Sequence, residues 1–346
     1  MAEEVPGTTA GSASAVRTHW SRVLVLGKVV VAAGVLWLLV KLELLDLSPL
    51  HALLEPWWFV AVACFALLTI WPLVAWRWLL LLRAQNLFAR FRDVFRIAYG
   101  SAFLGLYLPG TVGTDLARIG FGLSLPRSHV TVLTLSVLAD RIVGVAGLLL
   151  VGVVASIAYL AYLDPGVPGY AEIRSLVLVL AALFAAAGVA VLLGALLARR
   201  LHDFAQSARW AQRGLLLRIG ARVIEACRLY GDSPRSLLRA LAISVVVHSI
   251  TFAVLASIAW KLGISEASPW KYAIAGAIAA IVNSLSITPG GIGVGELAFA
   301  QILLWLEPAS RPVPYATVFL THRLLTALTL LPALAFLPNP FRRVRG

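Results

Sequence analysis

Long runs of hydrophobic residues separated by short polar segments make up most of the chain between residues 23 and 337. Six of these runs are long enough to cross about 30 Å of membrane hydrocarbon as single α-helices. The pattern therefore predicts an all-α polytopic membrane protein whose single transmembrane domain spans residues 23–338. We expect the six spans at residues 23–40, 57–82, 130–163, 176–197, 238–262 and 314–337.

Two further hydrophobic stretches, at residues 95–127 and 270–308, are each interrupted by a Pro-Gly pair. The first interruption lies in LYLPGTVGTDLAR (106–118) and the second in SITPGGIGVGELAF (286–299). The arms on either side are too short to span a membrane comfortably, so we expect each stretch to form a re-entrant hairpin of two broken helices. The residues that break the helices are Pro109, Gly110 and Gly113 in the first hairpin and Pro289, Gly290 and Gly293 in the second.

The two hairpins belong to a longer similarity between two regions of the chain, at about residues 57–163 and 238–337. Each hairpin is followed by a span with an arginine at a matching distance, Arg141 in SVLADRIVGVAGLLL and Arg323 in VFLTHRLLTALTLL. The hairpins are expected to enter from opposite sides of the membrane. The two regions would then form an inverted repeat. Transporters built on such repeats bind their substrate between the two halves. Chance is the alternative, because Pro-Gly is a common break.

Basic residues, most of them arginines, gather in a few connecting segments. Segment 83–96, segment 199–238 and the tail 339–346 are basic, so the positive-inside rule places them in the cytoplasm. This orientation puts both termini on the inner side of a cytoplasmic (inner) membrane, with the polar segment 1–22 as a disordered tail. Segment 199–238 has the spacing of a helix that lies in the inner headgroup region, although it could instead dock a partner protein.

Composition excludes several classes of protein. With 60% hydrophobic and 13% charged residues and a mean hydropathy of +0.90, the chain is not a water-soluble globule. The net charge of +13 comes without the basic soluble domain that nucleic-acid binding needs. We interpret the charge as the positive-inside pattern of a membrane protein, together with attraction to anionic lipids. Two cysteines make no disulfide framework, and we find no catalytic, nucleotide-binding or metal-spaced motif. We therefore expect no enzyme activity, cofactor, metal site or nucleic-acid partner.

Arginines inside the predicted spans are the sharpest chemical signal. An arginine near the middle of a membrane helix costs about 2.5–3.5 kcal/mol by insertion scales, so Arg141 and Arg323 should face a partner or a polar cavity. The carboxylates available to them are Asp140, which is adjacent in sequence, and Asp115 and Glu296 on the hairpins. Pairing alone and substrate binding are alternatives here. An arginine whose guanidinium releases its carboxylate and binds a phosphate instead would serve in both pairing and substrate binding.

Other polar residues near the hairpins have more than one interpretation. A helix that begins after Pro-Gly offers free N–H groups to an anion, although the same glycines also let helices pack closely. Asp115 and Glu296 are alternative proton carriers, with His322 either part of such a relay or simply packed. Asn283 is suited to tying down the broken backbone, and Arg77 is expected to snorkel from its span to the interface.

Three motifs, LPGTVGTDLAR, the Asp-Arg of VLADRIVG and NSLSITPGGIGVGE, together resemble the flippase-like family named for the transmembrane region of lysylphosphatidylglycerol synthase. The resemblance covers about residues 23–337 and implies a lipid translocase whose path is lined by the hairpins and the buried charges. Thr114 departs from the family pattern, in which a glycine is expected before the aspartate. The chain holds no soluble aminoacyl-transfer domain, which implies a free-standing member of the family. Besides the break residues, those expected along the path are Asp115, Arg118, Asp140, Arg141, Asn283, Glu296, His322 and Arg323.

These observations favour a lipid flippase that moves an anionic or amphiphilic headgroup across the cytoplasmic membrane. The expected partners are membrane lipids, with a lipid-biosynthesis enzyme and a second copy of the chain as further candidates. One alternative is a noncatalytic scaffold that holds a lipid- or glycan-synthesising enzyme through segment 199–238. Another is a membrane enzyme that acts on polyprenyl-phosphate substrates, with Asp115 or Glu296 as the base.

Overall fold

The structure is a computed structural model of the 346-residue chain. All regular elements among the residues it describes are helices. The predicted tail 1–22, the predicted basic tail 339–346 and most of segment 199–238 lie outside the described residues. The description covers residues 33–336 except 35, 54, 108–109, 163–169, 173, 177, 180, 184, 187–188, 190–224, 226–227, 265–266, 287, 289 and 308–312.

Four helices within the described residues are long and apolar enough to cross a membrane. Their positions agree with four of the six predicted spans, and they confirm an all-α polytopic membrane protein. The other two predicted spans, at 23–40 and 176–197, fall largely outside the described residues. The four helices are α2 (Trp57–Ala84), α5 (Val130–Tyr162), α8 (Pro234–Lys261) and α11 (Tyr315–Leu330), the last of which continues into the 3-10 helix η3 (Leu331–Phe336). A short 3-10 helix, η1 (Ser48–Leu53), precedes α2.

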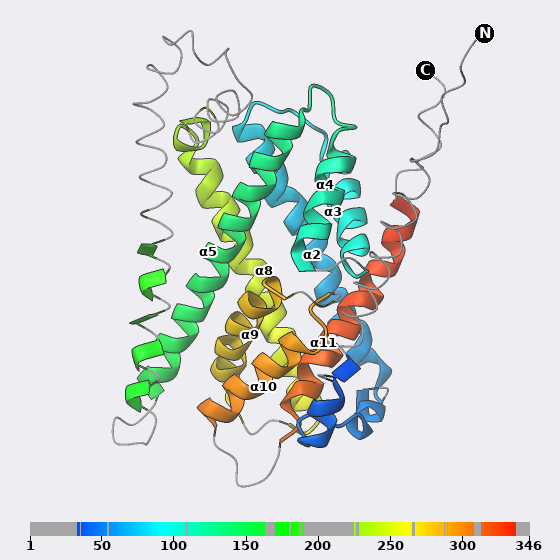
Figure 1. The fold of residues 1–346 in the computed structure, drawn as a ribbon, viewed down its shortest axis with the longest axis vertical. Helices are drawn as coiled ribbons and strands as arrows, with labels where there is room; N and C mark the ends of the chain where they lie inside the picture. Colours follow the sequence, from blue (N-terminus) through cyan, green and yellow to red (C-terminus); the bar gives the residue numbers. More distant parts are fainter. Residues whose placement is uncertain are drawn as a thin grey trace, which may run out of the picture.

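Each interrupted stretch folds as a pair of short helices that pack against each other. The first pair is α3 (Phe91–Gly105) and α4 (Gly110–Gly122), and the second is α9 (Pro269–Ser284) and α10 (Val294–Leu306). At 1.5 Å per residue these helices are about 20–24 Å long, which is less than the hydrocarbon thickness. In Figure 1 the α3–α4 pair lies in the upper half of the molecule and the α9–α10 pair in the lower half. We call these pairs the first and second hairpins.

Each hairpin is packed into its own hydrophobic core. Around the first hairpin, Trp78 of α2 and Leu133 of α5 are fully buried against α3 and α4. Around the second hairpin, Tyr272, Phe299 and Tyr315 fill a larger core that also includes α8. Because α2 and α5 run through both cores, they join two packing units that follow one another along the long axis (Figure 1).

Candidate functional site

The tips of the two hairpins meet near the middle of the molecule. Helix α4 contacts α9, and a Cβ atom built on Gly290 would lie 3.5 Å from the carbonyl oxygen of Leu106. The predicted break residues Pro109 and Pro289 lie outside the described residues, but Gly110 begins α4 and Gly293 precedes α10. The broken backbone of each half therefore faces that of the other.

Arg323 of α11 binds several groups of the second hairpin at once. Its Nε donates to Oε1 of Glu296 at 2.6 Å, and its Nη2 lies 3.4 Å from Oε2 of the same carboxylate. Nη2 also donates to Oδ1 of Asn283 at 3.0 Å and to the carbonyl of Gly291 at 3.2 Å. Nη1 donates to the carbonyl of Gly290. The guanidinium thus donates to two carbonyl groups at the break, of which that of Gly291 also accepts the backbone N–H of Gly295 at 3.2 Å.

Glu296 fixes the start of α10 while it pairs with Arg323. Its Oε2 accepts the backbone N–H of Gly293 at 2.8 Å, which is the glutamate half of a capping box. The preceding backbone takes left-handed conformations, with φ values of +58° at Gly290, +75° at Gly291 and +87° at Gly293. Such φ values favour glycine, so the Gly-rich sequence after the break is required by the path of the chain.

Substituting Gly291 should destabilise this turn more than a positive φ alone would. A Cβ atom at Gly291 would collide with the amide of Asn283, whereas a Cβ at Gly263, which has a similar φ of +71°, would meet nothing within 4 Å. We expect Gly291→Ala to lower the free energy of unfolding by about 1–3 kcal/mol more than Gly263→Ala. Thermal unfolding of the two variants in detergent measures the difference, and equal melting temperatures would show that Asn283 does not hold the turn.

The first hairpin carries a corresponding ion pair that is more open. Nε of Arg141 lies 3.1 Å from both oxygens of Asp115, and Nη2 lies 2.8 Å from Oδ1. The side chains of Arg141 and Asp115 are 38% and 21% exposed, against 18% for Arg323 and 0% for Glu296. The two halves of the sequence repeat therefore place the same kind of pair in unequal environments.

A second group of charges joins α4 of the first hairpin to α2 and α5 and is buried. Asp140 accepts from Nε of Arg77 at 2.7 Å and from its Nη2 at 3.0 Å, while Nη1 of Arg118 donates to Oδ2 at 2.9 Å. Nη1 of Arg77 donates to Oγ of Ser244 on α8 at 3.0 Å. The expectation that Arg77 snorkels to the interface is wrong, because α5 and α8 pack over it and Asp140 gives it a buried partner. We call Arg77, Arg118 and Asp140 the buried triad.

The predicted residues thus fall into three groups. Asp115 forms an ion pair with Arg141. Arg118 and Asp140 belong to the buried triad. Asn283 and Glu296 both bind Arg323. His322 stays apart from them. It is half-buried beside Phe319, and its buried Nε2 has no hydrogen-bond partner among the described residues. A role for His322 in a proton relay stays a prediction.

Sequence reasoning missed an ion pair at the opposite end of the second hairpin. Lys271, near the start of α9, is buried, pairs with Glu307 and lies with its ammonium 5.0 Å from the ring centre of Tyr159. The sequence feature that could have predicted this ion pair is a lysine near one end of the predicted hairpin and a glutamate near the other. Among the described residues no group of three metal-ligating side chains lies together.

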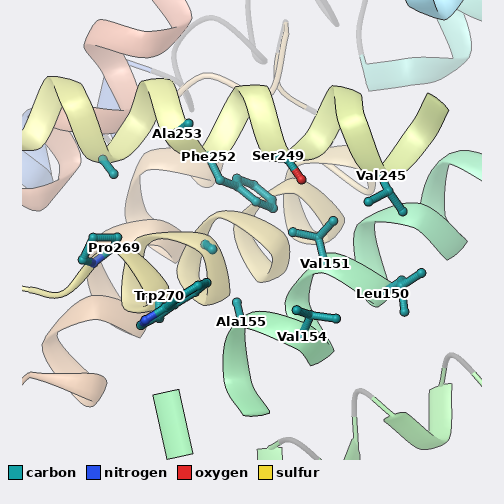
Figure 2. Close-up of a pocket in the computed structure, with 12 residues that line it drawn as sticks. Leu150, Val151, Val154, Ala155, Val245, Ser249, Phe252, Ala253, Pro269 and Trp270 are labelled. Atoms are coloured by element: carbon teal, nitrogen blue, oxygen red, sulfur yellow. The ribbon is translucent and has the colours of Figure 1, made fainter. Parts of the chain in front are cut away.

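An apolar groove of about 390 Å³ lies between α5, α8 and α9 (Figure 2). Val151 of α5, Phe252 of α8 and Trp270 of α9 are among the side chains that line it, and Ser249 supplies a hydroxyl. Its lining includes Leu150 and Val245, which are close in sequence to the α5–α8 contact at Gly147 and Ser244. A Cβ atom built on Gly147 would lie 2.5 Å from the Cβ of Ser244. Ser244, which binds Arg77 of the buried triad, is therefore followed in the sequence by a residue that lines the groove, Val245.

A comparison with protein-family profiles matches residues 25–333 to the lysylphosphatidylglycerol synthase TM region. The chain belongs to this family. The match confirms the family resemblance over nearly the whole chain, and it identifies a multi-pass membrane protein related to lipid metabolism or transport. No curated protein and no solved structure matches the chain.

Proposed function

We propose that this protein moves a lipid headgroup, anionic or amphiphilic, from one leaflet of the cytoplasmic (inner) membrane to the other, with both termini in the cytoplasm. The observation that supports the proposal best is the arrangement of the hairpins. Two pairs of short helices occupy opposite halves of the molecule and meet at their tips, each beside an arginine–carboxylate pair. Family membership supports lipid transport as one of the roles open to the chain.

The unequal exposure of the two ion pairs supports an alternating mechanism. In the described conformation the Arg141–Asp115 pair is partly open, while Glu296 is fully buried under Arg323. A phosphate presents two oxygens to a guanidinium much as a carboxylate does, so it can replace Asp115 at Arg141. The opposite conformation would expose Arg323 and enclose Arg141. Headgroup transfer between the two arginines would then follow the change in conformation.

The apolar surfaces of the molecule fit the hydrocarbon portion of such a substrate. Trp57, Phe65 and Tyr162 on α2 and α5 are among the large side chains with more than two thirds of their surface exposed. An apolar exterior of this kind belongs in lipid, which lets the tails of a substrate stay in the hydrocarbon while its headgroup follows the charged residues.

Removing the charge of Arg141 should slow translocation without unfolding the protein. An ion pair this exposed contributes less than about 1 kcal/mol to folding, so Arg141→Gln should melt close to the wild type. A charged hydrogen bond to the headgroup is worth about 1.5–3 kcal/mol, which corresponds to a loss of transport of about tenfold or more. Dithionite quenching of fluorescent phosphatidylglycerol in liposomes measures the rate at which the lipid changes leaflet.

Arg228→Gln is the matched control for this experiment. Arg228 forms an ion pair with Glu225 at the same 2.8 Å separation, away from both hairpins, so its removal should leave the rate unchanged. A wild-type rate in Arg141→Gln would contradict the role assigned to this arginine. Equal loss in both variants would point to a general effect of surface charge.

A further inference from the structure

The charges around the first hairpin do not balance. Arg77 and Arg118 share the single carboxylate of Asp140, and the neighbouring Arg141 is matched by Asp115. These five side chains form one electrostatic neighbourhood around Arg118, with three positive and two negative charges. At the second hairpin, by contrast, one arginine meets one glutamate. This group of five side chains therefore has one positive charge in excess.

The excess charge is at Arg118, whose donors are not all used. Arg118 is only 6% exposed, and its Nε has no hydrogen-bond partner among the described residues. One face of its guanidinium lies over the ring of Trp78, 5.2 Å from the ring centre. A buried N–H group without an acceptor is costly, and an unbalanced buried charge more so. The site lacks one hydrogen-bond acceptor and one negative charge.

The position of the triad restricts which ligand can supply the missing hydrogen-bond acceptor and negative charge. Asp140 is ten residues from the start of α5, which corresponds to about 15 Å along the helix. Arg77 also holds Ser244, whose sequence neighbour Val245 lines the apolar groove. A ligand bound at Arg118 thus lies well below the end of α5, within the length of a helix that can cross a membrane. An amphiphile fits these surroundings better than a free, fully hydrated ion.

The triad also selects among lipid headgroups. Both oxygens of Asp140 are occupied, Oδ1 by Arg77 and Oδ2 by Arg77 and Arg118. Asp140 already shares its single negative charge between two guanidinium groups, so it has no charge left to balance an ammonium group. A phosphodiester carries one negative charge, which neutralises the excess at Arg118, whereas a zwitterionic or cationic headgroup brings a positive charge that would need a further partner.

We propose that Arg118, supported by Arg77, binds the phosphodiester of a phospholipid whose headgroup carries one net negative charge. This inference names the substrate class for the path described above and rests on the proposed function only for the role of that lipid in transport. Binding itself is independent of translocation.

Native mass spectrometry of the full-length protein in detergent tests the assignment with two probes, phosphatidylglycerol and phosphatidylcholine. The wild type should retain phosphatidylglycerol preferentially, and Arg118→Met should reduce that preference about tenfold or more, as expected for a lost charged hydrogen bond. Arg83→Met is the matched control, because Arg83 is exposed near the end of α2. A wild type without preference, or an Arg118→Met variant that keeps it, would overturn the proposal.

Thermal unfolding without added lipid separates binding from a structural role. Because Arg118→Met removes an uncompensated buried charge and keeps an unbranched side chain, it should melt at or above the wild-type temperature. Arg118→Lys retains the charge without the fork and should restore some of the preference. If Arg118→Met melts lower and Arg118→Lys restores only the melting temperature, Arg118 is structural and the proposal fails.

Two further measurements identify the source of the anion and separate this inference from the proposed function. If inorganic phosphate displaces phosphatidylglycerol, the occupant is a free anion and the lipid assignment is wrong; failure to displace supports it. If the wild type prefers phosphatidylglycerol but moves no lipid in liposomes, the binding site stands and the proposed function fails. If it moves lipid with no preference, the proposed function stands and this inference fails.

Discussion

Asp140→Ala is expected to lower the free energy of unfolding by about 3–5 kcal/mol, the range measured when one partner is removed from a buried ion pair. The substitution leaves the guanidinium groups of Arg77 and Arg118 buried without a counter-charge, and both arginines are less than a tenth exposed. Thermal unfolding of the purified protein in detergent gives the melting temperature. Asp140→Asn should be milder, since the amide oxygen still accepts a hydrogen bond.

The control for this prediction is Asp232→Ala. Asp232 is exposed and lies 3.5 Å from Arg228, so its loss should change the melting temperature little. Removing all three charges of the buried triad, with Leu or Met in their place, should recover much of the stability lost in Asp140→Ala. If Asp140→Ala and Asp232→Ala had the same melting temperature, the carboxylate of Asp140 would not be the group that stabilises the two buried arginines.

Arg323→Ala should have a comparable effect on the second hairpin, about 3–5 kcal/mol. It leaves the fully buried carboxylate of Glu296 without its cation, and it removes the side-chain donors to the carbonyls of Gly290 and Gly291. Arg141→Ala should be much milder, because the Arg141–Asp115 pair is partly exposed. The two arginines, which are equivalent in the sequence repeat, are thus expected to differ in their contribution to folding.

A double-mutant cycle with Glu296→Gln and Arg323→Gln measures how strongly the pair is coupled. We expect the double variant to be more stable than the sum of the single losses predicts, because it removes both charges together. The same cycle on Asp115→Asn and Arg141→Gln should give a coupling energy below about 1 kcal/mol. Equal coupling energies at the two sites would contradict the difference in burial on which this prediction depends.

The long helices and the hairpins were predictable because their signals are local. The length of a hydrophobic run fixes whether a helix can span the bilayer, and α2, α5 and α8 end within a few residues of the predicted limits. Pro-Gly breaks a helix wherever it occurs, and Gly290, Gly291 and Gly293 show why glycine follows it. Glu296 could be named as one of the candidate partners of Arg323 because both belong to the second half of the repeat.

The partners of Arg77 were not predictable for a physical reason. In a water-soluble helix the polar face points outward, so periodicity shows which side chains are buried. Every face of α2 is apolar, because lipid replaces water, and the pattern does not indicate where an arginine points. Only the packing of α2 on α5 and α8 brings Arg77 to Asp140 and Ser244. Lys271 and Glu307 were missed because charged residues near the ends of short helices suggest surface loops.

The close approach of Gly290 to the carbonyl of Leu106 has a consequence for the energy barrier of the proposed transport. On the proposed path, a headgroup that travels from one leaflet to the other would have to push apart these stretches of main chain, because a Cβ atom built on Gly290 would already lie 3.5 Å from the carbonyl oxygen of Leu106. The resistance at this crossing point would then come mainly from the bonds that anchor the glycine loop to Arg323. Turnover would accordingly respond more to changes at that anchor than to the bulk of the residues along the route.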